Sequence, residues 1–370
     1  MRILSLFFLL IQQAVAPQTP LQVPELGPAI RQSVSSTPAE SPVMREGIAL
    51  FDQGKYAEAM VRYDQILKGS PNNTGAMYEK AQTLDKLRQF QMAIDLAAKG
   101  TEYLSPELPQ FYSLIGNVLD SQGQVPKAIE IYKKGIALET PNAGVLYLNM
   151  GVSYEIGMKD VVNAKMAFKR GALVDPNYPG LHYQLGAIYN AQGLRTPLLM
   201  SSMRFLVMEP NTPRSQGMYN VWRSMLDSRP MPAPPQTNPL FDYSHSSEQT
   251  CEGDLSQLDA ALVSSKAAAA GVGKSQIELL VDQVDNLFGT YATMQPGNDK
   301  DTFLWRYYIP YAVEMKQKGL VEPFVYYVNQ GPNLPGVRNW LIANPDRVNT
   351  FLLWSRSYHW PDKNSVDPAR

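Results

Sequence analysis

Proline recurs at a nearly constant interval through the first 210 residues, and this period constrains the fold more than any other feature of the sequence. Successive members of the series are separated by 35, 35, 35 and 34 residues: Pro71, Pro106, Pro141, Pro176 and Pro210. A period of this length is typical of solenoids, in which each unit buries its apolar side only by stacking on its neighbours. The sequence therefore predicts an array of stacked repeats.

Small residues recur in step with the prolines, at one equivalent position of each repeat: Gly47, Ala81, Gly116, Gly151 and Gly186. A residue without bulk at this position lets two helices approach closely. Proline ends a helix because it lacks an amide donor and forces the preceding residue out of helical geometry. The two series together predict repeats that are helix hairpins, each with a tight contact inside it and a stop at its end.

Over about 170 of the 370 residues the pattern resembles the tetratricopeptide repeat, which combines Leu-Gly and Tyr in its first helix with Ala-x3-aromatic in its second and a closing proline. Four repeats carry it as follows: Gly47, Ala59, Tyr63 and Pro71; Ala81, Ala93, Ala97 and Pro106; Tyr112, Ile115, Gly116, Ala128, Tyr132 and Pro141; and Tyr147, Met150, Gly151, Tyr154, Ala164, Phe168 and Pro176, with one extra residue in the turn. The resemblance implies an all-α, right-handed superhelical solenoid.

The fifth repeat departs from the pattern in its second helix. It keeps Leu185, Gly186 and Tyr189, but Leu198 and Ser202 replace the alanine and the aromatic residue. We expect about five hairpins, followed by a helical C-terminal region in which degenerate hairpins turn at Gly319 and Pro345. The chain divides into a signal peptide at 1–16, a proline-rich mobile tether at 17–42, the array at 43–213, a capping helix with a proline-rich linker at 214–253, and the helical region at 254–370.

The first 16 residues have the order of a secretory signal: Met1 and Arg2, then an apolar run, then small residues ending at Ala16. The apolar run is far shorter than the roughly 20 residues that cross a bilayer, so we expect export without an integral membrane span. The expected location is the periplasm or the cell envelope. A looser resemblance, in the aromatic and proline-interrupted tail, is to exported bacterial tetratricopeptide-repeat proteins.

Composition disfavours several function classes. The formal net charge of -1 gives no bulk attraction to nucleic acid. The only cysteine, Cys251, has no partner for a disulfide, and the three histidines are not spaced as metal ligands, so no metal or cofactor is expected. His182 is interpreted as a packed residue of a first helix. The C-terminal aromatic residues recur at helical spacing and are interpreted as core.

The resemblance implies a concave groove lined by the first helix of each repeat. In each first helix, the residue four positions after the small residue is expected to face this groove, and in repeats two to five these residues form a ladder of three carboxylates followed by an amide. The candidate groove residues are Tyr78, Gln82, Asp85, Lys86, Asn117, Asp120, Asn149, Glu155, Tyr183 and Asn190. These acids are either a binding surface for a basic partner or a solvated polar face. We expect a non-catalytic scaffold that binds protein or peptide. The alternatives are an assembly scaffold that binds through its convex face and C-terminal aromatic residues, and a cryptic hydrolase or glycan-binding module in 240–370; the oligomeric state is left open.

Overall fold

The computed structural model describes residues 20–227, 252–269, 273–331 and 334–369. These residues form 17 α-helices, most of them packed against their neighbours in the chain, so the predicted all-α class is confirmed. The predicted signal peptide lies outside the described residues, as do Cys251 and His245. No helix in the described part of the chain is both long and apolar enough to cross a membrane.

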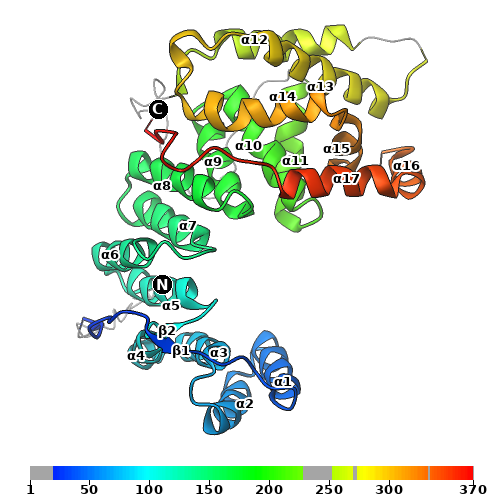
Figure 1. Cartoon of the computed structure of the whole chain (residues 1–370). Helices are drawn as coiled ribbons and strands as arrows, with labels where there is room; N and C mark the ends of the chain where they lie inside the picture. Colours follow the sequence, from blue (N-terminus) through cyan, green and yellow to red (C-terminus); the bar gives the residue numbers. More distant parts are fainter. Residues whose placement is uncertain (1–19, 228–251, 270–272, 332–333, 370) are drawn as a thin grey trace, which may run out of the picture.

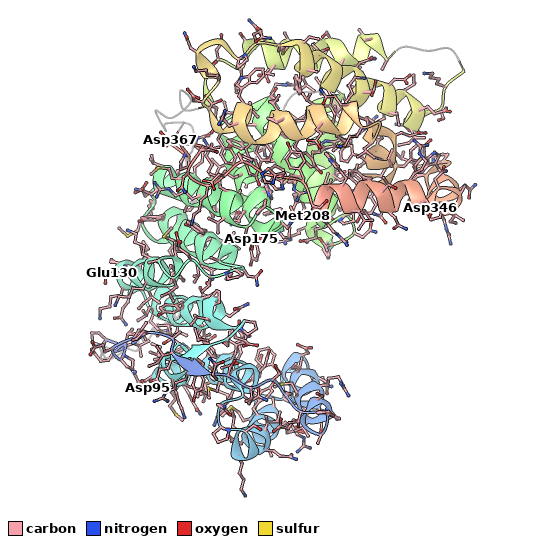
Figure 2. The ribbon with its side chains drawn as sticks, viewed as in Figure 1. Asp95, Glu130, Asp175, Met208, Asp346 and Asp367 are labelled. Atoms are coloured by element: carbon pink, nitrogen blue, oxygen red, sulfur yellow. The ribbon has the colours of Figure 1, made fainter. Side chains whose placement is uncertain are left out.

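Five antiparallel hairpins follow one another and form a curved stack (Figure 1). Their helices are α1 (Glu40–Asp52) with α2 (Tyr56–Gly69), α3 (Thr74–Lys86) with α4 (Phe90–Gly100), α5 (Leu108–Ser121) with α6 (Val125–Ile136), α7 (Gly144–Val152) with α8 (Val161–Val174), and α9 (Pro179–Ala191) with α10 (Arg195–Met208). The first helix of each hairpin faces the open side of the stack. Asp95 and Glu130, on the second helices α4 and α6, point to the opposite side (Figure 2).

The small residues lie where the two helices of a hairpin cross. A methyl group added at Gly47 would lie 2.6 Å from the ring of Tyr63, and at Gly116 or Gly151 it would lie 2.2 Å from the ring of Tyr132 or Phe168. Contacts this short cannot be relieved without moving a buried aromatic ring. The repeat thus requires glycine where its second helix supplies an aromatic residue.

The fourth hairpin absorbs its extra residue in a π-helical turn. This turn, η1 (Ser153–Gly157), continues α7 and adds the one residue by which the sequence exceeds the usual spacing between the glycine and the aromatic residue. Such turns are the form in which α-helices accommodate single insertions. Because the insertion is absorbed before α8 begins, Gly151 still meets Phe168.

The prediction of a mobile tether is wrong for residues 20–39, which lie against the array. The short strand β1 (Arg31–Gln32) pairs in parallel with β2 (Tyr103–Leu104), and Val34 bridges to Asn73. Apolar side chains of the segment, among them Leu26, pack beside the core of repeats two to four. Proline removes amide donors but leaves carbonyl acceptors and apolar side chains, so the segment binds the helices as an extended strand.

The C-terminal region packs on the last hairpin. Its helices are α11 (Pro213–Leu226), α12 (Ser256–Ala268), α13 (Gln276–Thr293), α14 (Ile309–Gln317), α15 (Val321–Val328), α16 (Val337–Ala343) and α17 (Pro345–Arg356), with shorter turns η4 (Gly297–Asp299) and η5 (Leu304–Tyr308). α12 contacts α10 and α11, and α15 contacts α10. The predicted cap at α11 is therefore not the solvent-facing end of the molecule, because further helices cover it.

Covering of α10 on both sides explains why its sequence departs from the repeat pattern. Twelve successive residues of this helix, from Thr196 to Val207, are buried. A helix that is apolar around its circumference is one that is buried on all sides. Ser202 replaces the aromatic residue here, and its hydroxyl contacts the sulfur of Met218 on α11.

Polar contacts also join the array to the C-terminal region. Arg204 of α10 is 1% exposed, donates to Ser355 Oγ at 2.8 Å and to Asn177 Oδ1 at 2.6 Å, and lies over the rings of Tyr311 and Trp360. Asp175 and Met208 lie at this junction in Figure 2. The prediction that the C-terminal aromatic residues form core is confirmed for Tyr307, Tyr308 and Tyr311, which are fully buried, whereas Trp305 is only partly buried and lines a pocket. These three rings therefore do not line a cleft.

Candidate functional site

The concave side of the last hairpin holds an open pocket of about 280 Å³. It lies between the first helix α9 and the following helix α11, and Leu198 of α10 contributes to its lining. Most of its lining is apolar or small: Tyr183, Gly186, Ala187, Leu198, Gly217, Met218 and Val221, with Asn190, Asn220 and Ser224 as the polar members. Two of the ten predicted groove residues, Tyr183 and Asn190, thus meet in one site.

Asn190 is the polar group of this pocket without an internal partner. Its side chain is 5% exposed, and neither Nδ2 nor Oδ1 has a hydrogen-bond partner within the described residues. A buried donor or acceptor left unpaired costs about 1–3 kcal/mol. Both the donor and the acceptor of this amide are unpaired, and both atoms are closed to solvent although the residue contributes to the pocket lining.

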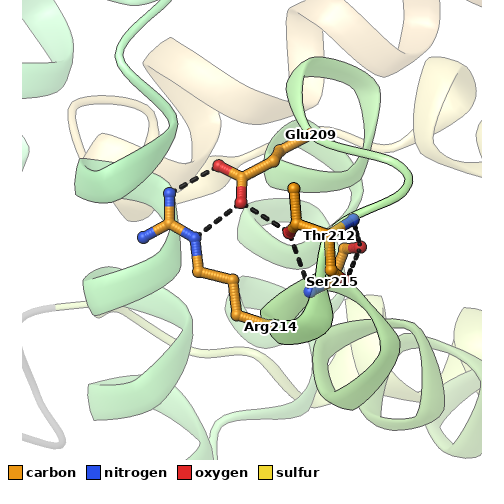
Figure 3. A network of polar contacts seen from close by, with 4 residues as sticks. All are labelled: Glu209, Thr212, Arg214 and Ser215. Carbon is orange, nitrogen blue, oxygen red and sulfur yellow. Dashed lines mark hydrogen bonds and ion pairs between the residues drawn. The ribbon is translucent and has the colours of Figure 1, made fainter. Parts of the chain in front are cut away.

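Tyr183, on the wall of the pocket, is held in place by its neighbours. Its ring packs on Phe205 with centroids 5.2 Å apart, and the guanidinium of Arg214 lies 5.4 Å from the ring centroid. Figure 3 shows how Arg214 itself is fixed: its Nε donates to Glu209 Oε1 at 2.7 Å, and Glu209 also accepts from Thr212. This pairing holds the pKa of Glu209 below its usual range, so the carboxylate stays ionised beside Arg214.

The capping of α11 belongs to the same network. The Thr212 hydroxyl accepts from the amide of Ser215, and the Ser215 hydroxyl accepts from the amide of Thr212. This reciprocal arrangement satisfies two amides at the start of the helix. It fixes where α11 begins, and with it the position of the pocket wall.

Several predicted groove residues bond to neighbouring helices. Asn149 donates to Ser113 Oγ at 2.7 Å, and Asp120 accepts from the Ser153 hydroxyl at 2.6 Å, so both pairs join the third repeat to the fourth. Asn117 accepts from the Tyr132 hydroxyl at 2.7 Å within its own repeat. These polar side chains therefore form hydrogen bonds between helices, both within a hairpin and between successive hairpins. The repeat pattern alone does not reveal this role.

The remaining predicted residues lie on the first helices of the second and fourth repeats. Asp85 and Lys86 are adjacent, with Nζ and Oδ2 3.8 Å apart, and Glu155 is 8% exposed in the π-helical turn. Burial raises the pKa of Tyr78 to about 12, and the Gln82 side chain beside it opposes that shift. The three acids of the predicted ladder thus differ in exposure: Asp85 and Asp120 are half-buried, whereas Glu155 is buried.

His182 is a packed residue, as predicted. Its Nδ1 lies 2.8 Å from the Tyr308 hydroxyl and its Nε2 lies 3.1 Å from the Pro176 carbonyl oxygen. Burial, with the charge of Arg204, lowers the pKa of His182 to about 3. The ring is therefore neutral, with its proton on Nε2, because a carbonyl oxygen only accepts.

Sequence reasoning missed a buried cluster of charges at the same junction. Lys169 Nζ lies 2.6 Å and Lys165 Nζ 3.5 Å from Glu252 Oε1, and all three side chains are at most 3% exposed. The signal was weak, since Lys165 and Lys169 lie four residues apart on a helix that the repeat pattern treats as solvent-facing on one side. The C-terminal region covers that side.

The C-terminal region also has a small polar pocket of about 310 Å³, lined in part by Asp254, Asp299 and Trp305. Asp299 accepts from the main-chain amide of Asp254, and Asp254 accepts from the amide of Ser256. Both carboxylates therefore shape the chain around them. Among the described residues, no cluster of three or more His, Cys, Asp or Glu side chains has the arrangement of a metal site.

Comparison with known proteins bears on the repeats. A family model described as tetratricopeptide repeat matches residues 50–118, from the end of α1 into α5. Residues 50–118 are therefore similar to tetratricopeptide repeats. Over 110 residues, which are 30% of this chain, it is 28% identical to the small glutamine-rich tetratricopeptide repeat-containing protein 2 of Mycosarcoma maydis. The match spans 31% of that relative, about a third of its length.

Proposed function

We propose that this protein is a non-catalytic scaffold that binds a protein or peptide along the concave side of its tetratricopeptide repeats. The observation that carries the proposal is the open pocket between α9 and α11, whose lining is mostly apolar or small. The convex side offers less room for a partner. Residues 20–36 lie against the connections on either side of the second repeat, and the C-terminal helices cover the second helix of the fifth.

We further propose that the protein acts after export, in the periplasm or cell envelope. The order of charged, apolar and small residues in 1–16 supports this location. Mass measurement of the mature protein in fractionated cells tests the location. A protein that retains Met1 and is found in the cytosolic fraction contradicts it.

A preference for basic partners is the finer part of the proposal. Asp85 and Asp120 lie on the first helices of successive repeats with part of each side chain open to solvent. Charges of one sign along a groove add their potentials and attract the opposite charge. Glu155 contributes through the same potential from a more buried position.

The experiment is capture of partners from the native envelope fraction, followed by binding measurements with each purified partner. The comparison is between the parent protein and a variant whose pocket is filled, Gly217→Leu. The proposal expects at least one partner that binds directly to the parent and more weakly to the variant. Partners that bind both proteins equally, and that protect the C-terminal region from hydrogen exchange, would move the function away from the groove.

A further inference from the structure

Another pocket lies where the repeats meet the C-terminal region, outside the concave groove. It encloses about 330 Å³ between the connection from α8 to α9, the end of α10, and the helices α15 and α17. None of its lining residues belongs to the first helix of a repeat: they are Asn177, Arg204, Val207, Met208, Tyr327, Leu352, Ser355 and Arg356. A partner held in the groove therefore does not account for this pocket.

Arg204 brings a buried positive charge to the wall of this junction pocket. Its side chain is 1% exposed, and its guanidinium stays protonated because arginine does not lose its proton in proteins. The terminal nitrogens donate to neutral acceptors, namely Ser355 Oγ at 2.8 Å, Asn177 Oδ1 at 2.6 Å and the Pro176 carbonyl oxygen at 3.3 Å. These bonds satisfy donors but leave the charge unbalanced.

Within the described residues, no carboxylate forms an ion pair with Arg204. Asp175, the acid of the same connection, accepts instead from the main-chain amides of Asn177 and Gly144. The unbalanced charge reaches His182, where burial and then the charge of Arg204 lower the pKa to about 3. Buried charges in proteins are normally paired because an isolated one is costly. An anion bound in the pocket would supply the missing charge.

Arg356 supplies the hydrogen-bond donors that Arg204 cannot spare. Its side chain is exposed, and no carboxylate of the described part of the chain pairs with it. It follows Ser355, whose hydroxyl accepts from Arg204, and its main-chain oxygen accepts from Asn177 Nδ2 at 3.4 Å. A guanidinium presents two parallel donors to a carboxylate or phosphate. Arg204 is therefore the fixed charge of the site, and Arg356 is its free donor.

The other walls of the junction pocket are mainly apolar. Val207 and Met208 end α10, Tyr327 belongs to α15, and Leu352 belongs to α17. Figure 2 shows Met208 beside α17. No acid is among the lining residues, and the volume is at the lower end of the roughly 300–1,000 Å³ of small-molecule sites. The lining thus suits a small ligand that has one anionic end and one apolar end.

We propose that the junction pocket binds a small organic anion, whose carboxylate or phosphate group contacts Arg356 beside the buried charge of Arg204. The short apolar body of the ligand packs on the apolar side chains of α10 and α17. This inference goes beyond the proposed function and does not depend on it, because the pocket shares no residue with the groove. Since α10 belongs to the repeats and α17 to the C-terminal region, the ligand stabilises the contact between them.

The first experiment compares benzoate with benzamide, which has the same shape and no charge. Thermal unfolding of the full chain is followed with each compound at rising concentration, and titration calorimetry measures the affinity. Benzoate should bind saturably at one site and raise the melting temperature, because it binds the folded state alone. Benzamide should do neither. Phenyl phosphate is the third probe, and whichever of the two anions binds more tightly identifies the group that the pocket takes.

A pair of arginine variants locates the binding. Arg356→Gln removes the free donor, and it should weaken benzoate binding about tenfold or more, the equivalent of a hydrogen bond to a charged group. Arg347→Gln is the matched control on the same helix, where Arg347 pairs with Glu322 and does not line the pocket. Both variants lose one positive charge, but Arg347→Gln should bind benzoate as the parent does.

A pair of adjacent leucines tests the apolar wall. Leu352 lines the pocket, whereas Leu353 is 66% exposed and does not. Leu352→Trp should narrow the pocket and weaken benzoate binding, and Leu353→Trp should leave it unchanged. Circular dichroism of the free variants checks their folding. If Leu352→Trp does not fold, the arginine pair still decides the question.

Other results overturn the inference. Equal affinities for benzoate and benzamide would show that the site does not recognise charge. Equal losses in Arg356→Gln and Arg347→Gln would show a diffuse attraction to positive charge in place of a pocket. The absence of saturable binding by either anion also refutes the site. None of these results bears on partners captured through the groove, so the proposed function is judged separately.

Discussion

His182 and Tyr308 meet across the junction between the repeats and the C-terminal region, with Nδ1 of the histidine 2.8 Å from the tyrosine hydroxyl. Because Nε2 donates to the Pro176 carbonyl oxygen, Nδ1 must accept the tyrosine proton. A second proton on the ring would end this arrangement. The contact between the two halves of the chain therefore depends on a histidine that stays neutral.

This dependence predicts a loss of stability in mild acid. The pKa of His182 is lowered to about 3 in the fold, below the value of about 6.5 of an unfolded chain. Its contribution is therefore complete above pH 6.5 and is lost as the pH falls from there towards 3, by about 1.4 kcal/mol per unit. Urea unfolding at pH 7 and pH 5 should differ by about 2 kcal/mol from this group.

The control for that prediction is His182→Gln, which cannot titrate. Asp175, whose pKa is raised by burial, contributes the opposite slope, and the comparison of parent with variant removes it. The variant should be less stable than the parent at pH 7 and should lose less stability on acidification. An identical pH dependence in the two proteins would show that His182 titrates normally.

The crossing of Gly151 with Phe168 predicts that even a methyl group is too large there. Gly151→Ala should reduce the free energy of unfolding by about 1–3 kcal/mol, because the added Cβ would lie 2.2 Å from the ring. Gly217→Ala is the matched control, since its Cβ meets nothing within 4 Å and alanine is the better helix former by about 1 kcal/mol. Thermal unfolding of both variants should therefore change in opposite directions.

The buried cluster at the junction predicts a large effect of removing its acid. Glu252→Gln should destabilise the fold by about 3–5 kcal/mol, because it removes the carboxylate that faces the buried charges of Lys165 and Lys169. The measurement is denaturant unfolding followed by tryptophan fluorescence. Glu139→Gln, which removes an exposed partner of Lys363, serves as control and should change stability by less than about 1 kcal/mol.

The acidic positions predict a salt-dependent affinity for captured basic partners. Asp85→Asn with Asp120→Asn and Glu155→Gln should weaken binding at low salt and flatten its salt dependence, since exposed charges are screened over about 10 Å at 0.1 M salt. Circular dichroism checks that the fold survives, because Asp120 also bonds Ser153. Unchanged affinity at low salt, with the fold intact, would show that the three acids only face solvent and do not contribute to binding.

The N-terminal segment predicts a local rather than a global effect. Val34→Pro removes the amide that donates to the Asn72 carbonyl oxygen at 3.1 Å. Hydrogen exchange should then rise in residues 30–36 and in β2, while the exchange of α9 and α13 stays as it was. Equal exchange in parent and variant would mean that apolar contacts such as that of Leu26 hold the segment without the strand pairing.

The sequence predicted the repeats well because their signal is local and periodic. Gly116 and Tyr132 lie in adjacent helices of one hairpin, so their contact follows from spacing within a single repeat. The same reasoning placed Tyr183 and Asn190 on the concave side. It could not show that Asn190 lacks a partner, since that depends on α11 and on every side chain around it.

Long-range packing set the limits of prediction. From the sequence, Lys165 and Lys169 would be expected to face solvent. In the structure they pair with Glu252, which lies more than 80 residues later in the chain. The proline-rich segment 20–39 was predicted to be a tether because proline disfavours helices. Its pairing with Tyr103 and Asn73 depends on two connections between helices, and these come together only when the array folds. Neither contact leaves a periodic mark on the sequence.

Repeat arrays are usually modular, so that units can be added or removed while the rest keeps its structure. The burial of α10 on both sides withdraws the fifth repeat from that freedom, because its side chains belong to one core that begins in α8 of the fourth hairpin and continues through Phe324 to Val366. Changes in repeat number, by evolution or by engineering, are therefore confined to the first three hairpins. The last two repeats and the helices that cover them can only be inherited, exchanged or lost as one piece.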